Sequence, residues 1–174
     1  VVSNPINQPF APSITDHLAE VDGVDEVMRV RYGRLDIDGA TEVGFGIEPS
    51  TFGAFMPIPM AEGSLADLTD RSIAVSEDVA GVAVGDVLSV SYAGTTVDLT
   101  VDAVFGTTPI LGGVSYVVPL ETLADLGVEQ VDAIAYITGD GSVPLSELHT
   151  RLDAAVADIP IVTVSDQEGY AKQL

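Results

Sequence analysis

The sequence has 174 residues, of which 47% are hydrophobic, so it can bury a core as one domain or as two small lobes. Its 27 acidic and 6 basic side chains give a formal net charge of −21, which repels phosphate backbones and excludes nucleic-acid binding. It has no cysteine, so disulfides, thiolate catalysis and cysteine-based metal sites are excluded as well.

The first predicted elements are a helix and a hairpin. The proline-rich residues 1–12 are expected to be an irregular lead-in. Apolar residues at helical spacing predict a short helix over about Ile14–Glu20. Partial alternation predicts a strand over Val24–Ile37, and Asp38-Gly39 is a hairpin turn signal that leads to a partner strand over Glu42–Ile47.

The middle of the sequence predicts short strands. Ser50–Met60 is apolar without a clear period, and Ser72–Ser76 is a short β-prone run. The acidic residues that follow this run predict a short helix over 77–80. Val87–Tyr92 and Thr96–Phe105 alternate well on either side of a turn and predict a second hairpin.

The last third alternates between strand-like and helix-like patterns. Strands are expected over Val114–Val118, Val131–Thr138 and Ile161–Val164, and helices over Leu120–Leu126 and Leu145–Ala157. The longer helix carries one apolar stripe, formed by Leu145, Leu148, Leu152, Ala155 and Val156. Ser165 and Glu168 have the spacing of a capping box, which predicts a final helix.

These elements predict an α+β fold. We expect a mixed sheet with strand-helix-strand units near both termini and a hairpin-rich β middle lobe. The chain is expected to be a single domain, which two small lobes could make up. In that division, about 13–48 with 114–174 forms the α/β lobe and about 49–113 the β-rich lobe.

The sequence carries few signals of catalysis. The histidines, His17 and His149, lie on different predicted helices without metal-ligand spacing, and neither a serine nucleophile elbow nor a phosphate-binding loop occurs. A Ser-His-Asp triad assembled in space stays open as an alternative. No cofactor is expected.

One acidic segment has the beginning of a calcium loop. Asp36, Asp38 and Glu42 place carboxylates around a glycine, as hard cations require, but the twelfth position of such a loop would be Ile47. A hairpin tip with solvated acids is the favoured interpretation, and a metal site at these three residues is the alternative.

The apolar run before the first β-rich segment is the candidate contact surface for a substrate or partner, because aromatic and methionine side chains gather there. The alternative is that it seals the edge of the core. Its candidate residues are Phe52, Phe55, Met56, Ile58 and Met60.

Several short motifs follow one another in an order that resembles the extracytoplasmic domain (the MacB-like periplasmic core domain) of FtsX/MacB-family ABC transporter permeases. The motifs are Met60-Ala-Glu-Gly63-Ser-Leu65, Ile73-Ala-Val-Ser76-Glu77, Val82-Ala-Val-Gly85-Asp86 and Val101-Asp-Ala-Val-Phe105. Further likeness lies in Leu18–Val27, Ser115–Gly127 and Val162–Leu174, so the resemblance covers nearly the whole chain.

This resemblance implies a non-enzymatic domain on the outer face of the cell membrane, here a soluble fragment from between the first two membrane helices. Its partners would be a cytoplasmic ATPase subunit, reached through the membrane helices, a second permease copy, and an external protein or lipid-like substrate. It would couple ATP-driven motion to export, lipid or lipoprotein extraction, or an external partner. The alternatives are a secreted or surface binding module, with or without dependence on Ca²⁺, and a small hydrolase with a spatially assembled site.

Overall fold

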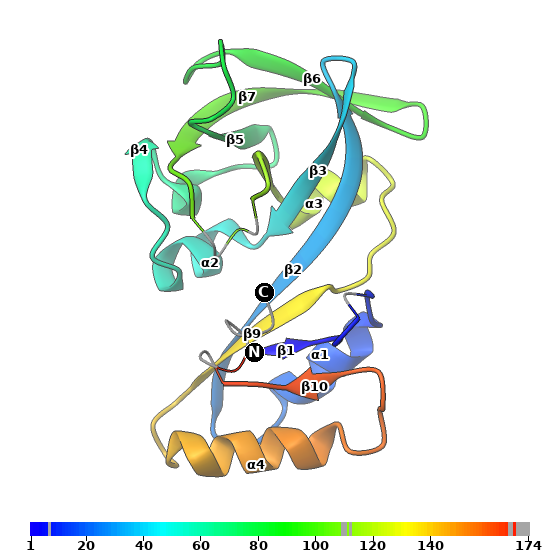
Figure 1. The fold of residues 1–174 in the computed structure, drawn as a ribbon, viewed down its shortest axis with the longest axis vertical. Helices are drawn as coiled ribbons and strands as arrows, with labels where there is room; N and C mark the ends of the chain where they lie inside the picture. Colours follow the sequence, from blue (N-terminus) through cyan, green and yellow to red (C-terminus); the bar gives the residue numbers. More distant parts are fainter. Residues whose placement is uncertain (7, 109–110, 112, 167–168, 170–174) are drawn as a thin grey trace. The chain divides into compact units, whose positions relative to one another are not determined.

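The computed structural model describes residues 1–6, 8–108, 111, 113–166 and 169 (Figure 1). It confirms the predicted α+β fold with a mixed sheet. The chain forms two compact units, Val1–Arg31 with Val131–Leu174, and Tyr32–Gln130. We call them unit 1 and unit 2, and the boundary at Arg31 falls inside strand β2, Val24–Ile37.

Unit 1 is a small antiparallel sheet with two helices. The strands run in the order β10 (Thr163–Val164), β1 (Val2–Ser3), β9 (Ile134–Gly139) and the first half of β2. Helices α1 (Pro12–Ala19) and α4 (Leu145–Ala155) contact each other. The core consists of Val2, Phe10, Leu18, Ala135, Leu148, Leu152, Val156 and Val162.

Unit 2 contains a ring of strands. The second half of β2 pairs with β3 (Ala40–Ile47), and the order continues through β8 (Tyr116–Pro119), β5 (Ser72–Ser76) and β7 (Thr95–Phe105). Strand β6 (Val87–Tyr92) pairs with both β7 and the end of β2, which closes the ring. The pairs β3–β8 and β5–β7 are parallel, whereas β5–β8, β6–β7 and β6–β2 are antiparallel.

The short elements of unit 2 attach to this ring. They are helix α2 (Pro49–Phe55), strand β4 (Met60–Glu62), the 3-10 turn η1 (Leu65–Asp67) and helix α3 (Leu120–Asp125). Strand β4 pairs with the end of β7, and α3 packs against β3 and β8.

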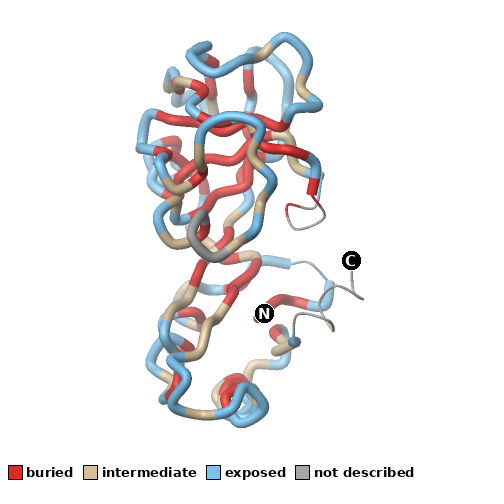
Figure 2. The backbone as a smooth tube through the Cα atoms, turned by 90° about the vertical axis from the view of Figure 1, so that its left-hand side faces the viewer, coloured by how far each residue is buried: buried red, intermediate tan, exposed pale blue. Residues whose placement is uncertain are grey.

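The core of unit 2 follows from alternation along the strands. In each ring strand apart from β3, two apolar residues that are two positions apart lie in the same cluster. This spacing is expected because successive side chains on a strand point to opposite faces. Those residues are Leu35, Ile37, Ile73, Val75, Leu88, Val90, Leu99, Val101, Tyr116 and Val118. Leu123, Leu126 and Val128 complete the cluster, and the buried stretches are red in Figure 2.

Asp38 stabilises the seam of the ring, which is the place where β6 pairs with the end of β2. Its backbone N–H donates to the carbonyl oxygen of Ser89 at 2.9 Å, and its Oδ1 accepts from the Ser89 N–H at 2.9 Å. Asp38 has a φ of 50°, a left-handed conformation that Asp tolerates better than most residues. The hairpin turn predicted from sequence is therefore also the point where β6 joins β2.

The structure corrects several predicted elements near the start of the chain. Residues 1–12 are not all irregular, because Val2 and Ser3 pair with both β9 and β10. Helix α1 starts at Pro12, whose fixed φ suits the first helical position. Ser50–Met60 contains most of helix α2, which a short apolar run without a period could not distinguish from a loop. The predicted helix at 77–80 is a turn.

Corrections near the end of the chain are smaller. Strand β8 starts two residues later than predicted, and β9 and β10 are also shorter at their start. Helix α4 ends at Ala155, and Leu145 is 77% exposed, so it does not belong to the buried stripe. The predicted final helix with Glu168 lies outside the described residues. None of the helices described is long and apolar enough to cross a membrane.

Candidate functional site

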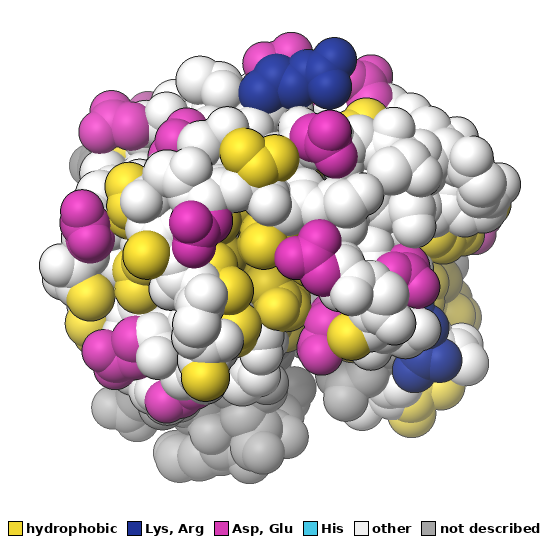
Figure 3. All heavy atoms as spheres, turned by 90° about the horizontal axis from the view of Figure 1, so that it is seen from above, with side chains coloured by type: hydrophobic (Ala, Val, Ile, Leu, Met, Phe, Trp, Pro, Cys, Tyr) yellow, Lys and Arg dark blue, Asp and Glu magenta, His cyan; other side chains and the backbone are white. Residues whose placement is uncertain are grey.

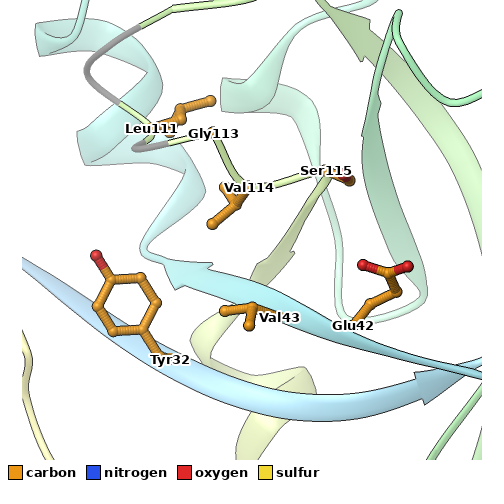
Figure 4. Close-up of a pocket in the computed structure, with 7 residues that line it drawn as sticks. All are labelled: Tyr32, Glu42, Val43, Leu111, Gly113, Val114 and Ser115. Carbon is orange, nitrogen blue, oxygen red and sulfur yellow. The ribbon is translucent and has the colours of Figure 1, made fainter.

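A hollow in unit 2 lies over strands β2 and β3 and has a volume of about 530 Å³. Tyr32 comes from β2, and Glu42 and Val43 come from β3. The other side is formed by the segment before β8, with Leu111, Gly113, Val114 and Ser115 (Figure 4). The hollow is open to solvent, so a ligand could enter it without a change in the fold.

Exposed apolar side chains make the wall of this hollow unusual. Tyr32 is 44% exposed and Val43 is 40% exposed, although both lie on strands whose other large apolar residues are mostly buried. In Figure 4 these two side chains stand next to each other and Val114 reaches towards Val43 from the opposite side. Leu111 is only 1% exposed and anchors that side of the hollow.

A chain of aromatic rings supports the Tyr32 wall. The Tyr32 and Phe45 rings meet edge to face with centroids 5.4 Å apart, and the Phe45 and Phe52 rings do so at 5.9 Å. Phe45 and Phe52 are buried, and Phe52 reaches Phe45 because α2 begins directly after β3. The rigid packing behind Tyr32 fixes the position of its exposed ring.

The electrostatic character of the hollow is negative. Glu42 carries the only charge among the lining residues that the structure describes. Burial raises the pKa of the Tyr116 hydroxyl above its usual value, and the carboxylates of Glu42 and Asp38 raise that pKa further. On the face shown in Figure 3, Asp and Glu side chains are scattered around exposed hydrophobic ones.

Two of the three predicted metal ligands already have backbone partners. Asp36 Oδ1 accepts from the Gly39 N–H at 2.8 Å, and Asp38 Oδ1 accepts from Ser89. Glu42 lies apart from this pattern, in the hollow. In the described part of the chain, no three His, Asp or Glu side chains are grouped closely enough to hold a metal ion. The hairpin tip with solvated acids stays the prediction, and calorimetric titration with Ca²⁺ can check the alternative of a metal site.

The predicted contact residues divide into two groups. Phe52 is 0% exposed, so it belongs to the core behind the hollow and cannot touch a partner. Met56, Ile58 and Met60 are half-buried, and their role stays a prediction. The side chain of Phe55 lies outside what the structure describes.

The histidines lie on helices in unit 1. His17 is exposed on α1. On α4, His149 Nδ1 lies 3.0 Å from Asp153 Oδ2, one helical turn away. This pair is a surface contact of the kind expected at this spacing.

Sequence reasoning missed the residues that line the hollow, although one signal was available. Tyr32 is in phase with Arg34 and Asp36 along β2, and this alternation places it on the solvent face with the two charged residues. A single exposed aromatic residue is common on protein surfaces, so this signal gains weight only because Val43 is exposed beside it. Val114 and Ser115 gave no such signal, since they were expected to lie in a strand.

Unit 1 holds a buried charge cluster that sequence reasoning also missed. The Asp132 side chain is 0% exposed, and its Oδ1 accepts from Arg31 Nε at 2.8 Å. Arg29 Nη1 lies 3.8 Å from Asp132 Oδ2, and Arg29 also pairs with Asp16 at the surface. The backbone of Asp132 forms a bridge with Phe10. This cluster ties β2 to the segment before β9.

Comparison with known proteins identifies the architecture. The chain is similar to the extracellular domain of the noncanonic ABC-type transporter YknZ from Gram-positive bacteria, with a TM-score of 0.64 and 16% identity over 91% of this chain and 90% of that one. It is also similar to the periplasmic region of MacB from Actinobacillus actinomycetemcomitans, with a TM-score of 0.62 and 12% identity over 95% of this chain and 82% of that one. The chain has a MacB-like fold.

This MacB-like fold is the one that the sequence motifs implied. No family model matches the sequence, and no curated protein matches it either. The likeness therefore rests on the arrangement of strands and helices over nine tenths of the chain. The two motif glycines take left-handed conformations in this fold, with φ of 70° at Gly63 and 93° at Gly85.

Proposed function

We propose that this chain is a non-enzymatic extracytoplasmic domain of an ABC transporter permease. It couples motion driven by a cytoplasmic ATPase to export, to lipid or lipoprotein extraction, or to an external partner. The observation that carries the proposal is the MacB-like fold, which matches the extracellular domain of YknZ along almost the full length of both chains. An open, apolar hollow on an acidic surface supports a contact role.

The 174 residues contain no cysteine, so an introduced cysteine can report the location of this segment when the unsubstituted full-length protein serves as the labelling blank. We would introduce Val87→Cys, at a position that is 61% exposed on β6, into the full-length protein in its native cell. A membrane-impermeant maleimide should label this variant in intact cells. The matched control is Val90→Cys on the same strand, which is 0% exposed and should react only after unfolding. Labelling of Val87→Cys only after cell lysis would contradict the proposal.

The flanking sequence tests the same proposal independently. Four membrane helices around this segment, and co-purification with an ATPase subunit, are the expected results. A second copy of the permease in the purified complex would support the predicted assembly. A gene that encodes no membrane helix would refute the transporter function and favour a secreted binding module.

We also propose that the chain is a single domain with two lobes. The compact units differ from the predicted lobes of about 13–48 with 114–174 and about 49–113, because residues 32–48 and 114–130 belong to unit 2, so we take units 1 and 2 as the lobes. Strands β3, β5, β6, β7 and β8 and the second half of β2, which form the ring, lie within Tyr32–Gln130. Expressed alone, this segment should give a dispersed amide NMR spectrum. A collapsed spectrum would show that unit 2 cannot fold without the rest of the chain.

A further inference from the structure

The hollow of unit 2 combines two features that select one kind of ligand. Its wall is apolar, with Tyr32 and Val43 exposed next to each other and Val114 opposite. Glu42 adds a carboxylate to the same lining. An apolar surface alone would accept any hydrophobic group, but a carboxylate in its wall disfavours anions and favours a positive charge.

The exposed ring of Tyr32 strengthens this preference. A tyrosine ring attracts a cation to its face, and the attraction is modest at an exposed site such as this one. The packing of Tyr32 on Phe45 holds the ring in place, so little conformational entropy is lost when a ligand binds. Aromatic walls of this kind bind the alkyl stem of a lysine or arginine as well as its charged end.

The residues around the hollow also favour a cationic ligand. From Tyr32 to Ile47, the hairpin that carries the wall has three acidic side chains against one arginine, Arg34. The whole chain has a net charge of −21, which draws cationic ligands towards it over several ångströms. Anionic lipids and phosphate-bearing ligands are repelled by the same field.

We propose that this hollow binds a cationic amphipathic peptide segment, whose apolar side chains contact Tyr32, Val43 and Val114 and whose basic side chain lies at Glu42. The volume of about 530 Å³ accommodates several side chains of such a segment. The assignment rests on the proposed function, because it describes what an extracytoplasmic domain would contact outside the membrane.

The test is a titration of the isotope-labelled 174-residue chain with a short peptide of alternating lysine and leucine, blocked at both ends. We expect saturable amide shifts at Tyr32, Glu42, Val43 and Gly113–Ser115. A lysine–serine peptide and a glutamate–leucine peptide should each bind more weakly. Equal binding by either peptide would overturn the proposal, since it requires both the apolar and the cationic part.

Two charge variants test whether Glu42 contributes to peptide binding. Glu42→Gln should weaken binding about threefold, as the loss of a partly exposed charge contact predicts. The matched control Glu129→Gln makes the same charge change at an exposed position of unit 2 outside the described lining and should leave the affinity unchanged. Equal weakening by both variants would show nonspecific attraction to an acidic surface and would refute the site.

A second pair of variants tests the ring. Tyr32→Leu keeps apolar bulk over Phe45 but removes the aromatic face, so we expect about threefold weaker binding. Val87→Ala is the control at an exposed position elsewhere in unit 2. Tyr32→Phe should bind as well as the original chain, which separates loss of the ring from loss of folding.

Further outcomes identify other possible occupants of the hollow. They also separate failure of this site from failure of the proposed function. Phosphatidylcholine vesicles that produce the same shifts would make lipid the ligand and overturn the peptide assignment. Concentration-dependent dimers with shifts at the same residues would make a second copy the occupant. Absence of peptide binding refutes the site but leaves the cysteine-labelling result, and hence the transporter function, intact.

Discussion

Units 1 and 2 are stabilised in different ways. Unit 2 has a closed ring of strands with alternating apolar residues inside. Unit 1 has an open sheet in which β1 and β10 are only two residues long, and it contains the buried Asp132 cluster. The stability of unit 2 therefore depends on close apolar packing and on backbone conformation, whereas the stability of unit 1 also depends on a few charged contacts.

Among the predicted variants, the largest loss of stability is expected at the charged cluster of unit 1. Asp132→Ala removes a fully buried carboxylate from Arg31, whose side chain is only 11% exposed. Loss of one partner of a buried pair costs about 3–5 kcal/mol of unfolding free energy. Urea denaturation of the variant measures this cost.

The control for this prediction uses the same arginine network. Asp16 is the surface partner of Arg29, and the Asp16 side chain is 63% exposed. Asp16→Ala should therefore lower the free energy of unfolding by less than about 1 kcal/mol. If the two variants lose equal stability, unit 1 does not depend on the buried charge and the contrast with unit 2 fails.

The next effect tests chain conformation in unit 2. Gly63 has a φ of 70°, and a Cβ there would lie 2.9 Å from the Cα of Ala103 and still closer to the backbone oxygen of Asp102. Gly63→Ala should therefore cost about 3 kcal/mol, from left-handed strain and crowding together. Thermal unfolding followed by circular dichroism would show the loss.

Gly85 is a matched control from another motif. Its φ is 93°, but a Cβ there would meet no atom within 4 Å. Gly85→Ala should cost only the left-handed strain, about 1 kcal/mol. Equal costs at the two glycines would mean that close packing at Gly63 does not matter.

A smaller effect is expected at the seam of the ring. Asp38→Ala removes the carboxylate that accepts from the Ser89 N–H and should cost about 1 kcal/mol. Asp38→Asn keeps an acceptor and tolerates the left-handed φ, so it should recover most of the stability. Hydrogen exchange at Ser89 gives a local readout, and unchanged protection in Asp38→Ala would contradict the role of this residue at the seam.

The smallest effect concerns a surface turn of unit 1. Hydrogen bonds from the Ser142 side chain and backbone N–H hold the pKa of Asp140 below its ordinary value of 3.8. The stabilisation is present above that ordinary value and is lost as the pH falls through the lower pKa of the folded state. Ser142→Ala should raise the Asp140 pKa, as carboxyl NMR titration can show, and an unchanged midpoint would argue against the hydroxyl as its cause.

Much of the fold could be predicted because it follows from local patterns. Strands β2, β5 and β6 have the predicted bounds. Alternation indicates β6 and part of β2, whereas β5 is a short β-prone run that is buried throughout. Helix α4 was predicted from spacing alone. In contrast, α2 and β1 were missed, because seven and two residues are too few to show a period.

The candidate site could be predicted only in part. Glu42 was a candidate metal ligand only in the alternative interpretation, and Phe52 was a candidate contact residue. In the structure Glu42 lines an apolar hollow and Phe52 packs behind it. Leu111 and Val114 reach the hollow from about seventy residues further along the chain than Val43. No local pattern records a contact over that separation.

The α+β class, the hairpins, the acidic surface and the order of motifs were already determined by residues close together in the sequence, because turn chemistry and side-chain periodicity act locally. The closure of the ring, the pairing of β1, the Asp132 cluster and the hollow at Tyr32 required the tertiary structure. Each of these features joins segments far apart in the chain, and their contacts exist only once the apolar faces of those segments have packed together.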